Sequence, residues 1–329
     1  MKIGVVIPAY NAEKYLRACL DSVLSQTVSD LGVYAMDDGS SDRTADILAE
    51  YAAKDPRVKC WRQSNRGLVA TMNALLDRLD DDVELVSFVD SDDFIHPRMY
   101  ELMTAELLRT GSDVAECRIV HVAESATVGD VFTTEPPCVS RTIDDMSVYL
   151  LKRTAPGQWI NKQNKLYRRD AIGSIRFQPT LSYEDDYFFA YEVNAAVRRK
   201  VIVDSEFYAY RATPGSATAK IPFREYVRAT QERIRLSLEL FLAKGRIPSA
   251  IEAEWRSELA KDAYRMCIRK NLKKNRDPVS RRELFRSSGV FFRELEGFVL
   301  TGLNPIQELI FRCAFRGRYA LARFLAYLT

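Results

Sequence analysis

The residues best suited to chemistry lie in two acidic loops, and the clearer of these is Asp90-Ser91-Asp92-Asp93. This loop follows the apolar run at residues 85–89, so its side chains are expected at the end of a β-strand. Three crowded carboxylates repel one another and ionise less readily unless a cation lies among them. Mg²⁺ and Mn²⁺ use one or two protein carboxylates together with substrate phosphates, which suits this loop. The alternative is a solvated turn that caps the next helix.

The second acidic loop contains Asp38 and Gly39 and follows the short apolar run at residues 33–36. A carboxylate at a strand end can accept the N–H of a pyrimidine base or a ribose hydroxyl, and glycine permits the tight turn. The alternative is a turn followed by a helix cap from Ser41 or Asp42.

Both loops require a scaffold of alternating strands and helices, and the first hundred residues have that pattern. Strands are expected at residues 3–7, 33–36, 58–61 and 85–89, and helices at 12–26, 42–52, 67–79 and from Pro97 onward. Repeated strand–helix units predict a mostly parallel sheet flanked by helices. Ligands of such sheets bind beyond the carboxyl ends of the strands, where both acidic loops fall.

The pattern is mixed after residue 113. Strands are expected at 114–122 and 128–133, a helix at 143–152, and one or two strands at 200–210, and nearly everything from residue 223 onward is helical. We therefore expect a catalytic domain at 1–217 and a helical carboxy-terminal region at 218–329.

Composition excludes several classes of protein and site. The 329 residues are 47% hydrophobic and 28% charged, which is typical of a globular protein. The six cysteines form no C-x-x-C pair, so we expect mostly buried, reduced thiols. Because His96 and His121 are the whole histidine content, a histidine-rich metal site or Ser-His-Asp hydrolysis is disfavoured. Carboxylates must therefore carry most of the chemistry.

Four motifs occur in order at the expected strand ends: VVIPAYN at 5–11, DDGSSDRT at 37–44, NRG at 65–67 and DSDD at 90–93. Together they closely resemble the family 2 glycosyltransferases, and in particular those of bacterial cell-surface polysaccharide synthesis. The resemblance continues through residues 164–169, 183–186, 208–211 and 215–217. It implies a GT-A fold, with a Rossmann-like, mostly parallel sheet flanked by helices, followed by a carboxy-terminal helical region.

The resemblance also assigns roles to the matching residues. Tyr10 would lie against the base, Asp38 would read the base, and Arg66 would lie near the nucleotide. Asp90 would contact ribose and share a Mn²⁺ or Mg²⁺ ion with Asp92. The complete set of implied nucleotide-sugar contacts is Pro8, Ala9, Tyr10, Asp38, Asn65, Arg66, Gly67, Asp90, Ser91 and Asp93, the last of which is either supportive or sugar-facing.

An acidic pair supplies the implied catalytic base, which is Asp185, oriented by Glu184. The alternative is that these carboxylates only cap a helix running to about residue 196. Trp159, Lys165 and Arg211 are second-tier donor or acceptor contacts. A core tryptophan, a solvated lysine and a plain surface arginine are the respective alternatives.

The activity implied is inverting transfer of a sugar, as by a hexosyltransferase, from a UDP-sugar to a hydroxyl of a glycan or lipid-linked acceptor. A nucleotidyltransferase is the first alternative, although Pro8-Ala9-Tyr10-Asn11 is not the glycine-rich, basic loop that would hold a triphosphate. The second alternative is a non-catalytic subunit that binds the nucleotide-sugar. A retaining hydrolase is disfavoured because it has no need for a loop that reads a base. No nucleic-acid partner is expected, and the oligomeric state, including a homodimer, stays open.

Basic charge is concentrated at the carboxy terminus, where residues 261–329 hold 15 Lys and Arg against 6 Asp and Glu. One amphipathic helix is expected at 305–328, with Arg312, Arg316 and Arg323 on its polar face. This helix could lie on an anionic membrane surface or pack on the protein core. No secretory signal or membrane span is expected, which predicts a cytoplasmic protein, with attachment to the inner face of the membrane left open.

Overall fold

The computed structural model of this chain describes residues 1–146, 161–179, 185–213, 223–238, 277–294 and 305–316, together with 268, 272, 318, 319 and 322. The chain divides into two compact units. The first comprises Met1–Pro179 and Asp185–Ser216, and the second comprises Thr180–Glu184 and Ala217–Thr329.

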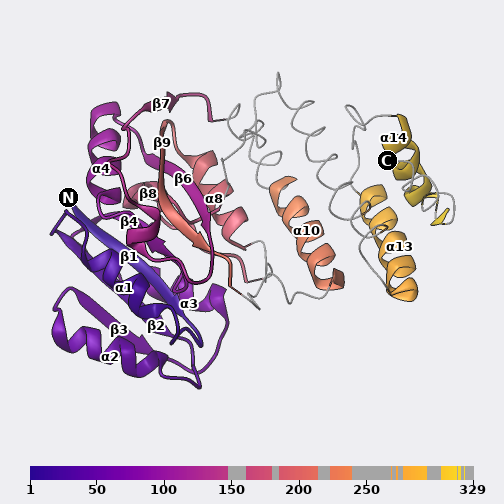
Figure 1. Ribbon diagram of the computed structural model, residues 1–329. Helices are drawn as coiled ribbons and strands as arrows, with labels where there is room; N and C mark the ends of the chain where they lie inside the picture. Colours follow the sequence, from indigo (N-terminus) through magenta and orange to yellow (C-terminus); the bar gives the residue numbers. More distant parts are fainter. Residues whose placement is uncertain are drawn as a thin grey trace. The chain divides into compact units, whose positions relative to one another are not determined.

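A mixed sheet forms the centre of the first unit (Figure 1). Its nine described strands are β1 (Lys2–Ala9), β2 (Leu31–Asp37), β3 (Val58–Arg62), β4 (Val83–Phe88), β5 (Phe94–Ile95), β6 (Val114–Val122), β7 (Ser140–Ile143), β8 (Lys165–Arg168) and β9 (Lys200–Arg211). They are ordered β3-β2-β1-β4-β8-β6-β9-β5, and β7 pairs with β9. The first four strands in this order are parallel, whereas β8 is antiparallel to β4 and β6. Four neighbouring strands therefore end at one edge of the sheet.

Helices flank this sheet and supply the rest of the core. They are α1 (Leu16–Leu24), α2 (Thr44–Lys54), α3 (Leu68–Leu76), α4 (Met99–Thr110), α5 (Val128–Val131), α7 (Arg169–Ile172) and α8 (Asp185–Ala196). In α1, Leu16, Cys19, Leu20 and Val23 recur at the spacing of one helical face, and all four are buried. β1 is buried along nearly its whole length, as expected for a parallel strand covered on both faces.

The predicted α/β architecture is confirmed, and one strand predicted in this unit is wrong. Residues 128–131 form the short helix α5 instead of a strand, because Thr127 and Asp130 make a reciprocal capping box that begins a helix. The helix expected at 143–152 begins later than predicted, because residues 140–143 form β7 and pair with β9, and Met146 is helical. Residues 147–152 lie outside the described residues.

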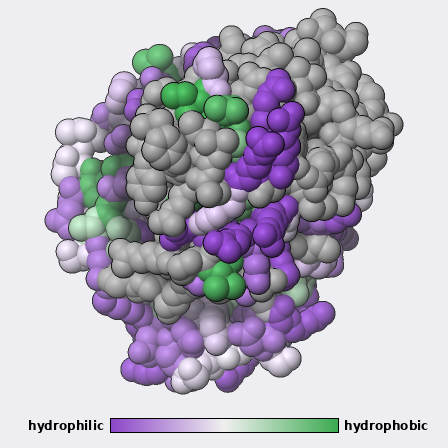
Figure 2. Space-filling view, turned by 90° about the vertical axis from the view of Figure 1, so that its right-hand side faces the viewer, coloured by the Kyte–Doolittle hydropathy of each residue, from purple (hydrophilic) through white to green (hydrophobic). Residues whose placement is uncertain are grey.

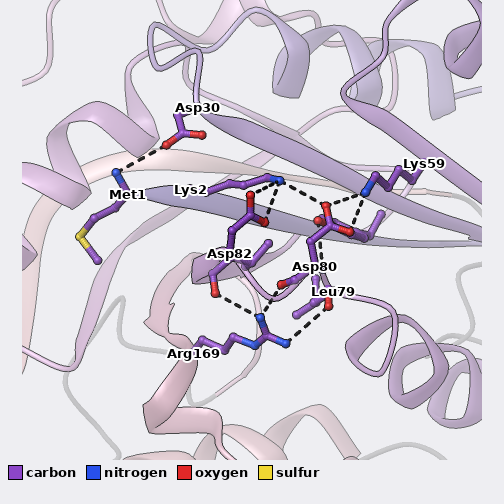
Figure 3. A network of polar contacts seen from close by, with 10 residues as sticks. Met1, Lys2, Asp30, Lys59, Leu79, Asp80, Asp82 and Arg169 are labelled. Carbon is purple, nitrogen blue, oxygen red and sulfur yellow. Dashed lines mark hydrogen bonds and ion pairs between the residues drawn. The ribbon is translucent and has the colours of Figure 1, made fainter.

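A polar network ties together the strand starts, at the sheet edge opposite the acidic loops (Figure 3). Lys2 of β1 and Lys59 of β3 both pair with Asp80, which precedes β4. Arg169 donates to the backbone carbonyl of Asp80, and Lys2 also pairs with Asp82. The network lowers the pKa of Asp80 to about 2, chiefly through the hydrogen bond from Lys59.

Helices make up the described part of the second unit, namely α10 (Phe223–Leu238), α13 (Pro278–Glu294) and α14 (Pro305–Phe315). α14 packs against α13, and its side chains Ile310 and Cys313 are buried. The expectation of one continuous helix at 305–328 is wrong, because α14 ends at Phe315 and Arg316 is in a turn. None of the described helices is long and apolar enough to cross a bilayer.

The described surface is mainly polar on the face drawn in Figure 2, where hydrophobic residues emerge in small separate groups. Among the described residues, only a few large hydrophobic side chains are exposed, such as Tyr10 and Leu68.

Candidate active site

The candidate site is built from the carboxyl ends of β3, β2, β1 and β4, which are neighbours in the sheet. Asn65 follows β3, Asp38 follows β2, Tyr10 follows β1, and Asp90 follows β4. Because parallel neighbours end side by side, motifs that are up to eighty residues apart in sequence share one edge.

Asp38 organises the loop that leads into α3. Its Oδ1 accepts the backbone N–H of Arg66 at 2.9 Å and the side-chain amide of Gln63 at 2.8 Å. Its Oδ2 accepts the N–H of Gly67 at 2.8 Å, and its own N–H donates to the carbonyl of Ala9 at 2.9 Å. The carboxylate is 4% exposed. Asp38 therefore couples the ends of three strands, in addition to the base-reading role that the sequence predicts for it.

Gly39 sits where the β2 and β3 loops come closest. It has a φ of +77°, and a Cβ placed on it would lie 2.7 Å from the backbone nitrogen of Asn65. Asn11, with a φ of 48°, links the β1 loop to the same turn. Its backbone N–H donates to Ser40 at 2.9 Å, and its side-chain oxygen accepts the N–H of Ser41 at 2.9 Å. These contacts hold the three loops in one arrangement.

Tyr10 and Arg66 present side chains at this edge. Tyr10 is 53% exposed although Pro8 and Ala9 just before it are buried. Arg66 and Asn65 are exposed on a loop whose backbone is fixed by Asp38. An exposed aromatic ring and an exposed guanidinium can stack on a base and contact a phosphate, respectively.

Two side chains that the sequence analysis missed bind Asp90. The ammonium of Lys162 lies 2.8 Å from Oδ1 of Asp90, and the amide of Gln163 donates to Oδ2. Lys162 is only 2% exposed. The available signal was the polar run 161–165 directly before Leu166 and Tyr167.

Asp92 and Asp93 differ in their surroundings. Burial, followed by the charge of Asp90, raises the pKa of Asp92, whose Oδ2 accepts a hydrogen bond from Thr213 at 3.2 Å. Burial raises the pKa of Asp93 well above its usual value. Asp93 is 1% exposed and accepts hydrogen bonds from Tyr208 at 2.7 Å and from the N–H of Arg211 at 2.8 Å. Asp93 was expected to be either supportive or sugar-facing, and these contacts fit the supportive role.

Arg211 is not the surface arginine that was one alternative for it. It is 5% exposed, and its guanidinium donates to the carbonyls of Asp92 at 2.8 Å and Ala126 at 2.9 Å and to that of Glu124. The same group lies 5.4 Å from the ring centre of Tyr15. Arg211 therefore supports the acidic loop from within the protein.

Lys165 is likewise not solvated, because it is fully buried. Its ammonium donates to Asn164 at 2.9 Å and lies 3.5 Å from Glu116, which also pairs with the buried Lys200. Burial lowers the pKa of Lys165, and it lowers that of Lys200 to about 8. The structure therefore places Lys165 in a buried cluster with Glu116 and Lys200, and not at the surface.

The predicted acid pair falls at the edge of the described chain. Asp185 is the first residue of α8, where the helix dipole favours a negative charge. Glu184 and Trp159 lie outside the described residues.

A metal centre made of protein side chains alone is not present in the described residues, where no three His, Cys, Asp or Glu side chains are grouped to hold an ion. Asp90 and Asp92 do fit a Mg²⁺ or Mn²⁺ that is also bound by phosphates. Burial and then the charge of Asp90 raise the pKa of Asp92, and a cation bound there would favour its ionised form.

Sequence comparison identifies relatives of this chain. The model of glycosyl transferase family 2 matches residues 4–202. EpsH of Bacillus subtilis (strain 168) is 31% identical over 219 residues, which are 64% of this chain and 60% of EpsH. The match therefore spans less than two thirds of that relative.

Structural comparison identifies similar folds. TarS of S. aureus, in a crystal structure of residues 1–349 with UDP-GlcNAc, has a TM-score of 0.76 at 20% identity, covering 99% of this chain and 91% of that one. The mannosyltransferase PcManGT from Pyrobaculum calidifontis, in complex with GDP-Man and Mn²⁺, has a TM-score of 0.51 at 16% identity, covering 99% and 86%. At these identities the likeness concerns the fold alone, and it agrees with the predicted GT-A type.

Proposed function

The chain belongs to glycosyl transferase family 2, and from that premise we propose that it transfers a sugar from a nucleoside-diphosphate sugar to an acceptor hydroxyl, with inversion at the anomeric carbon. The observation that carries this proposal is the convergence of four loops at neighbouring strand ends, with Asp38, Asp90 and Asp92 among them.

UDP is the proposed nucleotide. An exposed Tyr10 beside a buried Asp38 provides a ring for stacking and a carboxylate near the base. The UDP-GlcNAc complex of TarS, a protein of the same fold, also favours a UDP-sugar as the donor. Arg66, together with the N-terminus of α3 beginning at Leu68, suits the negative diphosphate.

A divalent metal, Mn²⁺ or Mg²⁺, is proposed at Asp92 and Asp90. The GDP-Man and Mn²⁺ complex of PcManGT supports a metal in this fold. When bound, the ion would offset the charge that develops on the departing diphosphate. Asp93, Tyr208 and Arg211 would hold the acidic loop in place during this event.

Asp185 is the proposed catalytic base. The acceptor oxygen forms a bond to the anomeric carbon while the bond from that carbon to the diphosphate oxygen breaks, and the hydroxyl proton passes to Asp185. The hydroxyl becomes acidic only as it attacks, so a positioned carboxylate of ordinary pKa is sufficient.

The proposed acceptor is a bacterial cell-surface polysaccharide or a lipid-linked glycan. This acceptor class rests on the resemblance to bacterial polysaccharide glycosyltransferases and is therefore the most distant inference from the site itself.

The test is a screen of nucleotide-sugars with Mn²⁺ or Mg²⁺, read as release of nucleoside diphosphate by the full chain and by Asp185→Asn. We expect one donor class to turn over and Asp185→Asn to reduce kcat by about 10²- to 10⁴-fold with little change in donor affinity. Failure of every nucleotide-sugar to bind would remove the enzyme proposal. Full activity of Asp185→Asn would instead show that Asp185 is not the catalytic base.

A further inference from the structure

The chain itself places a positive charge, the ammonium of Lys162, next to the acidic loop at residues 90–93. Lys162 places its ammonium 2.8 Å from Asp90, and Gln163 occupies the other oxygen of the same carboxylate. Lys162 is 2% exposed, whereas Asp90 is 23% exposed. A buried ammonium therefore pairs with a partly exposed carboxylate that is also a proposed metal ligand.

The acidic loop carries three carboxylates, those of Asp90, Asp92 and Asp93, which repel one another unless positive charge lies nearby. Lys162 forms an ion pair with the first of them. Lys162 therefore supplies part of the positive charge that the cluster requires. A divalent ion held by Asp90 and Asp92 would have to share Asp90 with this ammonium, and the two cations repel each other.

We propose that Lys162 makes metal binding depend on the donor, by opposing the binding of a free divalent ion at Asp90 and by pairing with the donor diphosphate when nucleotide and metal bind together. This role rests on the proposed function and adds a residue to it. The diphosphate brings negative charge for both cations, so the repulsion that weakens binding of the ion alone is offset in the complex.

The experiment measures binding of Mn²⁺ alone, from the EPR signal of free Mn²⁺, to the wild-type chain and to Lys162→Met. Lys54→Met is the matched control, since Lys54 is an exposed lysine of α2 that pairs with Glu50, and its replacement changes the net charge equally. We expect Lys162→Met to bind Mn²⁺ at least about tenfold more tightly than wild type, and Lys54→Met to bind it as wild type does.

A second readout is the affinity for UDP in the presence of saturating Mn²⁺, by calorimetry. We expect it to be about tenfold weaker in Lys162→Met, because a charge-assisted hydrogen bond is lost and Asp90 loses its counter-charge. Lys162→Gln, which retains a donor toward Asp90 but carries no charge, serves if Lys162→Met does not fold, and the same changes are expected in it.

The possible outcomes separate the two proposals. Equal or weaker Mn²⁺ binding in both Lys162 variants would overturn the role of Lys162 while leaving the proposed function intact. Unchanged UDP binding would overturn its pairing with the diphosphate. If neither Mn²⁺ nor UDP binds to any form, including wild type, the proposed function itself is overturned, and the role of Lys162 with it.

Discussion

The carboxylate of Asp38 accepts the backbone N–H of Gly67 at 2.8 Å, so the end of β2 fixes the start of α3. A residue expected to read a base is thus also the support of the neighbouring loop, which carries the exposed Arg66. This relationship gives the first of five predictions.

Replacement of Asp38 by Asn should weaken UDP binding by about tenfold or more and lower the free energy of unfolding by about 1–3 kcal/mol. The reason is that an amide has one accepting oxygen in place of two, so the hydrogen bond from the backbone N–H of Arg66 or of Gly67 is lost. Calorimetric titration and thermal unfolding measure the two effects. Asp46→Asn, an exposed site on α2, is the control and should change neither by a comparable amount.

Gly39→Ala should cost more stability than Gly111→Ala. Both glycines have positive φ, but a Cβ at Gly111 meets nothing within 4 Å, whereas one at Gly39 would lie 2.7 Å from the Asn65 backbone nitrogen. Gly111→Ala should cost about 1–2 kcal/mol of strain, and Gly39→Ala at least about 1 kcal/mol more. Chemical denaturation compares them. Equal losses would mean that the loops adjust, and UDP affinity should then also be preserved.

Asp80→Asn should reduce the loss of unfolding free energy that occurs as the pH falls from 5 to 2. The pKa of Asp80 is lowered to about 2, first by Lys59, so its contribution is present above an unfolded pKa of about 4 and is lost as pH falls toward 2. The pairs are partly exposed, so we expect only about 1 kcal/mol. Urea unfolding from pH 5 to 2 is the measurement, with the exposed Asp81→Asn as a control that keeps the wild-type slope.

Glu116→Gln should destabilise the first unit by about 3–5 kcal/mol, because it leaves the ammonium groups of Lys165 and Lys200 buried without their carboxylate. Arg118 lies on the same strand as Glu116, β6, and forms an exposed ion pair with Asp204 of β9. Arg118→Gln should cost less than about 1 kcal/mol. Thermal unfolding followed by circular dichroism compares them. Similar losses for both variants would contradict the importance assigned to burial.

Two neighbouring residues of α14 separate its packing from a membrane role. Ile310 is fully buried and Leu309 is 44% exposed. Ile310→Asp should lower the unfolding temperature markedly, because it buries an unpaired charge, whereas Leu309→Asp should leave it nearly unchanged. If the carboxy-terminal region binds membranes, Leu309→Asp should reduce sedimentation with anionic liposomes. Unchanged sedimentation would show that Leu309 is not part of a membrane-binding surface.

Much of the fold was predictable because its signals are local. The apolar runs preceding Asp38 and Asp90 became β2 and β4, and the later strand at 114–122 has the predicted bounds. The strand predicted at 128–133 failed because apolar residues suggested β-structure while the capping box of Thr127 and Asp130 determined a helix. β7 was missed because its pairing partner, β9, lies about sixty residues further along the chain.

The candidate site was predictable in its acidic members and not in their partners. Asp38, Asp90 and Asp92 stand in motifs directly after strands, so their position followed from the strand order. Lys162 could not be assigned to Asp90, because 72 positions of sequence separate them and no periodicity links them. The sequence also left the exposure of individual side chains undetermined. Lys165 and Arg211 were expected at the surface or against a ligand, and both are buried.

The sequence by itself determined the family, the parallel strand–helix units and the carboxylates at the strand ends, because motif order and hydrophobic periodicity are properties of short segments. Only the tertiary structure decided which charges face one another. Ion pairs such as Lys162–Asp90 and Lys200–Glu116 form between distant strands and loops, and their strength depends on a burial that no single segment encodes.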